Sequence, residues 1–95
     1  MVYNGFMNRW ETIFKTLANV NRLKIIRLLS DKPKLNVSDI SEHLKISFSA
    51  TSRHLIILQR VDVLIAEGSA GHVFYSLNRE MPKDFRFAVR LFSEC

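Results

Sequence analysis

The stretch that decides the fold is residues 36–60, NVSDISEHLKISFSATSRHLIILQR. Its first third places apolar side chains on one side of a helix that Asn36 can cap, and the part after Ser47 repeats this arrangement in a longer helix. Only three residues, 45–47, separate the two apolar patterns. We therefore predict two short helices that meet at a tight turn, the second covering residues 47–60.

The sequence before this pair predicts two more helices. Aromatic and apolar residues recur at helical spacing over residues 5–18. Asn19 can cap a second helix whose wide apolar face ends near Ser30, before Lys32 and Pro33. This second helix belongs to the core.

The sequence after the pair changes from helical to strand periodicity. Residues 63–67 and 72–77 are β-rich runs, and residues 68–71, Gly-Ser-Ala-Gly, predict a hairpin with a four-residue loop. Pro82 then suits the start of a last helix. We predict one domain over residues 1–95, mainly α with a small β-hairpin: a winged helix-turn-helix of about five helices and a two-stranded wing.

Composition and charge restrict the class of protein. The chain has 95 residues and is 47% hydrophobic, but no apolar run reaches the roughly 18 residues of a membrane span. Cys95 is the only cysteine, which excludes an intrachain disulfide and suits a cytoplasmic location. We expect its thiol to be inert rather than to have a redox role. Residues 20–60 hold eight basic and three acidic side chains, a balance that favours a polyanionic partner.

Two motifs in this order resemble the ArsR-type (arsenical-resistance repressor) family. Residues 17–26, LANVNRLKII, resemble the opening signature, and residues 46–58 resemble the recognition-helix signature with Ser-Arg-His-Leu at 52–55 intact. The resemblance covers roughly residues 6–92. It implies a homodimeric winged-helix repressor on a palindromic operator in double-stranded DNA, usually released by a metal ion or another effector.

The helix over residues 47–60 is the predicted DNA-reading element. With Thr51, Leu55 and Leu58 turned inward, the opposite face presents short hydroxyls and a guanidinium that can contact phosphates and base edges. His54 could make either a DNA contact or a structural hydrogen bond, and the sequence does not decide between them. For Arg22 we expect a structural ion pair rather than a phosphate contact. The candidate DNA-binding residues are Lys45, Ser47, Phe48, Ser49, Thr51, Ser52, Arg53, His54, Ile56, Arg60 and His72.

The first and last helices are the predicted dimer interface. Their aromatic residues exceed what a core of this size can bury, although both helices could instead pack on their own subunit. The candidate interface residues are Phe6, Trp10, Ile13, Phe14, Phe85, Ala88, Val89 and Phe92.

We expect no metal, no cofactor and no catalysis. The resemblance places the family's thiolate ligands at Asn36 and Ser38, and its other metal site at Asp84 with Arg86 in place of a histidine; these side chains do not form either site. A glycine-rich phosphate loop and an obvious acid–base pair are missing from the sequence. Two alternatives stay open: a winged-helix module that binds proteins, and a constitutive DNA-binding protein without an effector.

Overall fold

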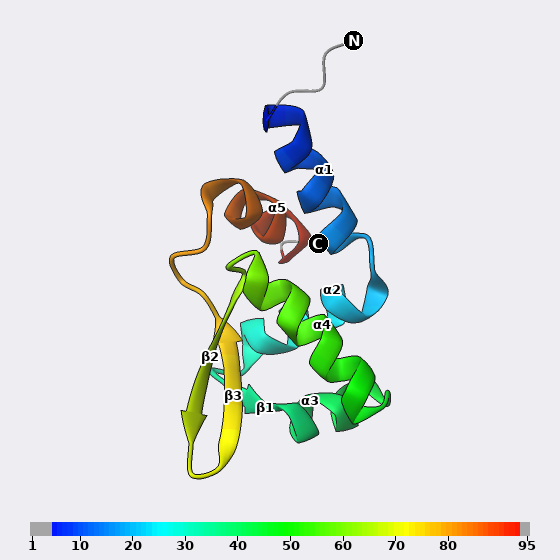
Figure 1. Ribbon diagram of the computed structural model, residues 1–95, viewed down its shortest axis with the longest axis vertical. Coiled ribbons are helices and arrows are strands. Elements are labelled where there is room, and N and C mark those ends of the chain that lie inside the picture. Colours follow the sequence, from blue (N-terminus) through cyan, green and yellow to red (C-terminus); the bar gives the residue numbers. More distant parts are fainter. Residues whose placement is uncertain (1–4, 94–95) are drawn as a thin grey trace.

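The computed structural model describes residues 5–93, without the side chains of Phe6 and Ser93 (Figure 1). Within this range the chain forms five helices and a three-stranded antiparallel sheet, so the predicted mainly α winged helix-turn-helix is confirmed. The elements in chain order are α1 (Gly5–Leu17), α2 (Val20–Asp31), β1 (Leu35–Asn36), α3 (Val37–Leu44), α4 (Phe48–Arg60), β2 (Leu64–Ser69), β3 (His72–Leu77) and α5 (Lys83–Ser93).

Side-chain caps fix where three of the helices begin. The Asn19 side chain accepts from the backbone N–H groups of Asn21 and Arg22 at 3.0 and 3.2 Å, at the start of α2. Asn36 and Ser47 cap α3 and α4 in the same way, at 2.8 and 3.0 Å. Each such cap contributes about 1 kcal/mol to helix stability. All three predicted caps are confirmed.

The sheet has the strand order β1-β3-β2, and β1 is a strand that the sequence did not predict. It pairs Leu35 with Tyr75, which ties the chain just before α3 to the wing. The predicted four-residue hairpin loop is wrong, because β2 and β3 pair as far as Ser69 with His72. The turn is only Ala70-Gly71, and both residues have the positive φ (51° and 81°) that favoured two-residue hairpin turns require.

Non-glycine residues occupy left-handed conformations at three junctions of the described chain. Lys45 (φ 57°) ends α3 before the turn into α4, and Asp62 (φ 62°) lies between α4 and β2. Ala70 (φ 51°) is in the wing turn. A side chain in this region costs roughly 1–2 kcal/mol, so packing around these turns must maintain them.

The core lies between the helices and the inner face of the sheet. Fully buried side chains come from α2, α3 and α4, and Tyr75 of β3 closes the core on the sheet side. Helices α1 and α5 also contribute to it: Ile13 and Phe85 are 0% exposed and Val89 is 7% exposed. The prediction that these three residues form the dimer interface is therefore wrong, because their own subunit already covers them.

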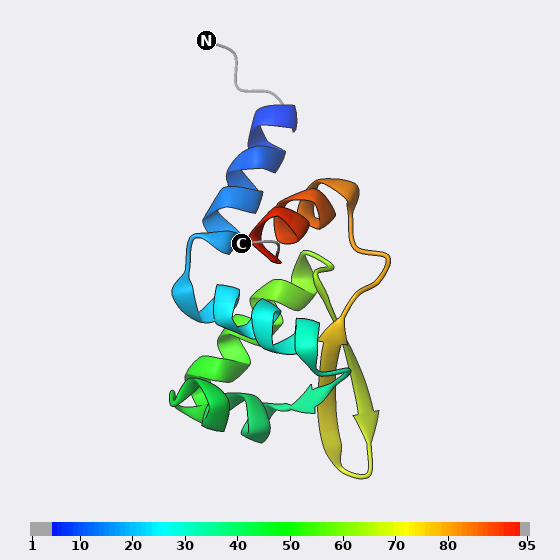
Figure 2. The same ribbon diagram turned by 180° about the vertical axis from the view of Figure 1, so that it is seen from behind.

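The elements divide the molecule into two ends. Helices α1 and α5 lie at one end and the turn of the wing lies at the other, as both the front view and the view from behind show (Figures 1 and 2). Helix α4 crosses between these ends on the side opposite α2. The predicted interface helices and the predicted DNA-binding helix thus occupy different parts of the surface.

Candidate nucleic-acid interface

One side of α4 is fixed in the core and the other is open to solvent. Thr51, Leu55 and Leu58 are each 0% exposed, which orients the helix. The opposite face carries exposed side chains at i, i+4, i+7 and i+11. These are Ser49, Arg53, Ile56 and Arg60.

Thr51 is a correction to the candidate set. Its side chain is fully buried, and its hydroxyl donates to the Ser47 carbonyl oxygen at 2.9 Å. A side chain with no accessible surface cannot contact DNA, so the prediction for Thr51 is wrong. Its helical spacing from Leu55 and Leu58 already placed it on the inner face.

The first turn of α4 meets the wing around a shallow groove. Phe48 is 58% exposed, and it lines this groove together with residues of the wing turn and the first turn of α3. The lining residues are Asn36, Val37, Ser38, Phe48, Gly71, His72 and Val73. The fold thus brings Phe48 and His72, which are 24 positions apart in the sequence, to one site.

A second hollow follows the rest of α4. It is lined by Arg53, Ile56, Ile57 and Arg60. Ile57 was missing from the candidate set, although it is 37% exposed, as is Ile56. Residues 55–58 are Leu-Ile-Ile-Leu, and this uniformly apolar run does not reveal that its two leucines are buried while its two isoleucines are exposed.

His54 is half-buried and lies beside Arg22, which is in the first turn of α2. Its Nδ1 lies 3.3 Å from Nη1 of Arg22. The same guanidinium donates from Nε to the Thr16 carbonyl at 2.6 Å and from Nη2 to the Lys15 carbonyl at 3.2 Å. These partners of Arg22 are two carbonyls and an imidazole, where the sequence favoured a carboxylate. Burial, followed by the charges of Arg22 and Arg53, holds the pKa of His54 below its usual value of 6.5.

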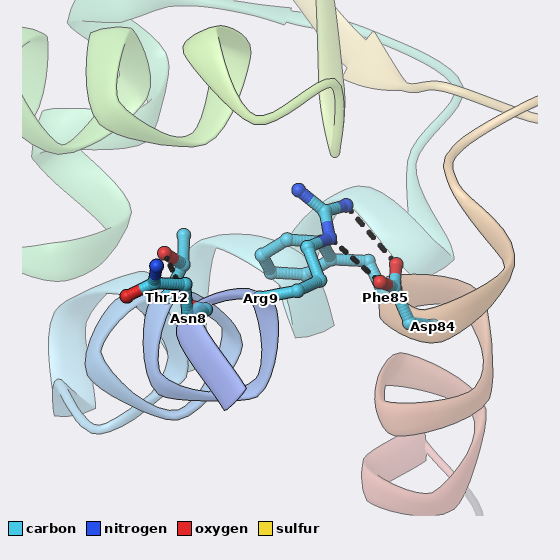
Figure 3. Close-up of polar contacts among 5 residues, drawn as sticks. All are labelled: Asn8, Arg9, Thr12, Asp84 and Phe85. Atoms are coloured by element: carbon cyan, nitrogen blue, oxygen red, sulfur yellow. Dashed lines mark hydrogen bonds and ion pairs between the residues drawn. The ribbon is translucent and has the colours of Figure 1, made fainter. Parts of the chain in front are cut away.

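A bidentate ion pair connects α1 with α5. Arg9 donates from Nε and Nη2 to the two carboxylate oxygens of Asp84, at 2.6 and 3.0 Å (Figure 3). The hydrogen bonds from Arg9 lower the pKa of Asp84, and the backbone N–H of Phe85 adds to this effect. The resemblance would place the Asp84 carboxylate in a metal site, but here both of its oxygens accept hydrogen bonds from Arg9. Across residues 5–93, no cluster of three or more His, Cys, Asp or Glu side chains could hold a metal ion.

Helices α1 and α5 each carry exposed apolar side chains, and we call these residues together the α1–α5 patch. Phe14 is 64% exposed, and its ring lies 5.7 Å from that of the half-buried Trp10. Phe87 and Leu91, which the sequence analysis missed, are 60% and 54% exposed. The patch consists of Met7, Phe14, Phe87 and Leu91.

Other predicted interface residues are placed less openly. Ala88 and Phe92 are half-buried, and the guanidinium of Arg27 lies 5.7 Å from the Phe92 ring centroid. The side chain of Phe6 and the whole of Cys95 lie outside the described residues. In residues 5–93 we find no helix with the length and apolar character that a bilayer crossing requires.

This arrangement of helix, turn, outward-facing helix and β-hairpin defines the winged helix-turn-helix class of DNA-binding domain. A sequence model described as "Bacterial regulatory protein, arsR family" matches residues 19–64. The chain is 33% identical to the transcriptional repressor SdpR of Bacillus subtilis over 74 residues, which cover 78% of this chain and 81% of SdpR.

The transcriptional activator HlyU of Vibrio cholerae is similar in both sequence and structure. It is 38% identical over 66 residues, covering 70% of this chain and 60% of HlyU. A solved HlyU structure superposes with a TM-score of 0.79 at 28% identity, over 97% of this chain and 96% of the HlyU chain. The chain described here belongs to the ArsR family, and it is a DNA-binding transcription regulator rather than an enzyme.

Proposed function

We propose that two copies of this chain, each forming one domain over residues 1–95, bind a palindromic operator and repress transcription. Each copy would place α4 in the major groove. The observation that carries this proposal is the outward face of α4, which offers two guanidinium groups opposite a fully buried face. Since relatives include a repressor and an activator, the direction of regulation needs its own reporter assay.

The chemistry of the α4 face assigns a role to each kind of side chain. Arg53, near the middle of the helix, can pair with guanine O6 and N7 or clamp a phosphate. Phe48 and Ile56 can contact thymine methyl groups. The remaining polar and basic groups would contact the DNA backbone and fix the register: these are Lys45, Ser47, Ser49, Ser52, Arg60 and His72.

The α1–α5 patch supports a second copy of this chain as its occupant. Phe14 and Phe87 are each at least 60% exposed, which is unusual for phenylalanine on a monomer. Helices α1 and α5 lie at the end of the molecule opposite the turn of the wing, so a dimer formed through them would leave the wing turn and the first turns of α4 free (Figures 1 and 2). We expect Phe14→Ser to shift the protein from dimer to monomer in sedimentation at micromolar concentration, whereas Phe48→Ser should leave the dimer intact. Equal sedimentation of both variants and the wild type would refute this assignment.

The DNA assignment is tested by selecting bound duplexes from a random pool and then measuring affinities by fluorescence anisotropy. We expect two equivalent half-sites about one helical turn apart. Arg53→Ala should lower the affinity by about 1–3 kcal/mol and relax the base preference at one position in each half-site. Arg79→Ala, an exposed cation beyond the wing, is the matched control and should bind as the wild type does.

The salt dependence separates DNA binding from a merely basic surface. Affinity for the selected operator should fall steeply between about 50 and 200 mM salt, because several phosphates lose their counterions on binding. An affinity that is independent of salt, or an Arg53→Ala variant that binds as tightly as Arg79→Ala, would overturn the proposal.

A further inference from the structure

We infer that Arg22 is a positioning residue that holds the recognition helix α4 in a fixed orientation to α1, and that His54 is the acceptor through which it does so. The inference rests on the proposed function, since it concerns the DNA-binding helix. It assigns Nδ1 of the half-buried His54 to a contact within the subunit and not to DNA.

The geometry of one guanidinium carries the argument. Arg22 lies in the first turn of α2, yet its donors reach two other helices. Nε and Nη2 bind the carbonyls of Thr16 and Lys15 at 2.6 and 3.2 Å, and Nη1 binds Nδ1 of His54 at 3.3 Å. The carbonyls in the last turn of a helix have no partner within the helix, so the guanidinium satisfies α1 at its C-terminal end. Because the guanidinium is planar and rigid, its bonds to both helices fix the middle of α4 relative to the C-terminal end of α1.

The coupling joins the two surfaces on which a dimeric regulator depends. Helix α1 carries Phe14 of the α1–α5 patch, and α4 carries the DNA-facing residues. The angle between these helices determines how far apart, and in which direction, the two α4 helices of a dimer point. Both helices also pack against α2, so the guanidinium adds a directional link to an existing apolar contact.

The link requires an unprotonated Nδ1 on His54. Arginine has only donors, so Nδ1 must accept, and the imidazole is neutral with its proton on Nε2. The charged groups acting on the ring are Arg22 from α2 and Arg53 from α4, and both oppose a positive charge on it. A proton on Nδ1 would remove the acceptor and place a cation beside Arg22. Acidification should therefore break the link.

The first experiment uses the selected operator and two further duplexes with spacers one base pair longer and shorter. The wild type should prefer the selected spacing by about tenfold or more, since one base pair changes both the distance and the rotation between half-sites. Arg22→Ala and His54→Leu should bind the selected operator about tenfold more weakly, as expected for a lost hydrogen bond to a charged group, and should lose most of the spacing preference. His54→Asn, whose Oδ1 can replace Nδ1 as acceptor, should keep the preference.

The pH dependence provides the readout that a merely stabilising role would not change. As the pH is lowered from 8 through the depressed pKa of His54, the wild type should lose spacing preference, whereas His54→Asn, which carries the same His43 and His72, should keep it. A purely structural role for Arg22 would lower the folded fraction and leave the ratio of affinities for the three spacings unchanged. That unchanged ratio in both Arg22→Ala and His54→Leu would overturn the inference.

A measurement without DNA separates this inference from the proposed function. In ¹⁵N-labelled free protein, the chemical shift of His54 Nδ1 should be that of an unprotonated ring nitrogen at neutral pH. The imidazole should titrate at a lower pH in the wild type than in Arg22→Ala. A protonated Nδ1 at neutral pH would refute the inference even if the protein binds its operator. A correct tautomer together with wild-type protein that shows no spacing preference would instead refute the palindromic dimer.

Discussion

Removing the carboxylate of Asp84 should weaken the attachment of α1 to α5. The pair with Arg9 is bidentate, with N–O distances of 2.6 and 3.0 Å, and the side chains of Arg9 and Asp84 are 38% and 27% exposed. Fully exposed pairs contribute about 0–1 kcal/mol, and a bidentate, partly shielded pair belongs at the upper end, so we expect a coupling energy of about 1 kcal/mol.

Asp84 also has a second role in α5. Its Oδ1 accepts the backbone N–H of Phe85 at 2.8 Å, in the first turn of the helix, where a negative charge is favourable. This contact adds roughly 0.5–1 kcal/mol. We therefore expect Asp84→Ala to lower the free energy of unfolding by about 1.5–2 kcal/mol, and Arg9→Ala, which also loses a cation–π contact 5.1 Å from the Phe85 ring centroid, by a similar amount.

The assay is a double-mutant cycle in urea, followed by Trp10 fluorescence at one fixed protein concentration. A matched control cycle uses Glu11 and Lys15, an i,i+4 pair on α1 whose N–O distance is 3.1 Å and whose side chains are 48% and 76% exposed. Its coupling energy should be about 0.3–0.5 kcal/mol. An Arg9–Asp84 coupling no larger than this control would refute the reasoning.

The coupling should also depend on pH in a defined direction. The folded-state pKa of Asp84 is lowered from 3.8, so its stabilising contribution is fully present above that value. It is lost as the pH falls through the lower folded-state pKa. Repeating the cycle at pH 6 and at pH 3 should therefore show the coupling energy decreasing at the lower pH.

Three further experiments test the wing, the core and the DNA contact. Ala70→Gly should stabilise the protein by about 0.5–1 kcal/mol in urea unfolding, because it relieves a positive φ, whereas Ala66→Gly in β2 should destabilise it. Ile26→Ala, at a fully buried position, should cost about 2–5 kcal/mol in the same assay, against no more than about 0.5 kcal/mol for exposed Val20→Ala. Replacing operator thymines one at a time by uracil should weaken binding by up to roughly fivefold at the positions contacted by Phe48 or Ile56, because uracil lacks the methyl group. In Ile56→Ala the effect should disappear at the position that Ile56 contacts. Equal binding of all uracil-substituted duplexes would contradict these apolar contacts.

The features that the sequence predicted well are those determined by local interactions. Asn19, Asn36 and Ser47 each bond to backbone groups within three residues, so their positions in the sequence are enough to mark where helices begin. The helical periodicity of residues 47–60 likewise identified the buried face of α4. These predictions did not depend on the rest of the fold.

The features that the sequence missed depend on distant partners. Strand β1 exists because Leu35 pairs with Tyr75, and two residues alone carry no strand signal. The helical stripe on α5 marked its apolar residues but could not tell which of them its own subunit covers. Phe85 is fully buried in the structure, while Phe87, two positions away, is 60% exposed. The partners of Arg22 were hidden for the same reason, since His54 is 32 positions away.

The two-residue strand β1 also determines where this chain can accept foreign sequence. Because Leu35 and Asn36 are paired with β3 and lead directly into α3, extra residues there would displace the helix-turn-helix and the sheet together. The Ala70-Gly71 turn is exposed, and it only joins β2 to β3, which are paired right up to the turn at Ser69 and His72. A short tag or a fluorophore attached at this turn would leave the architecture intact and report on its surroundings.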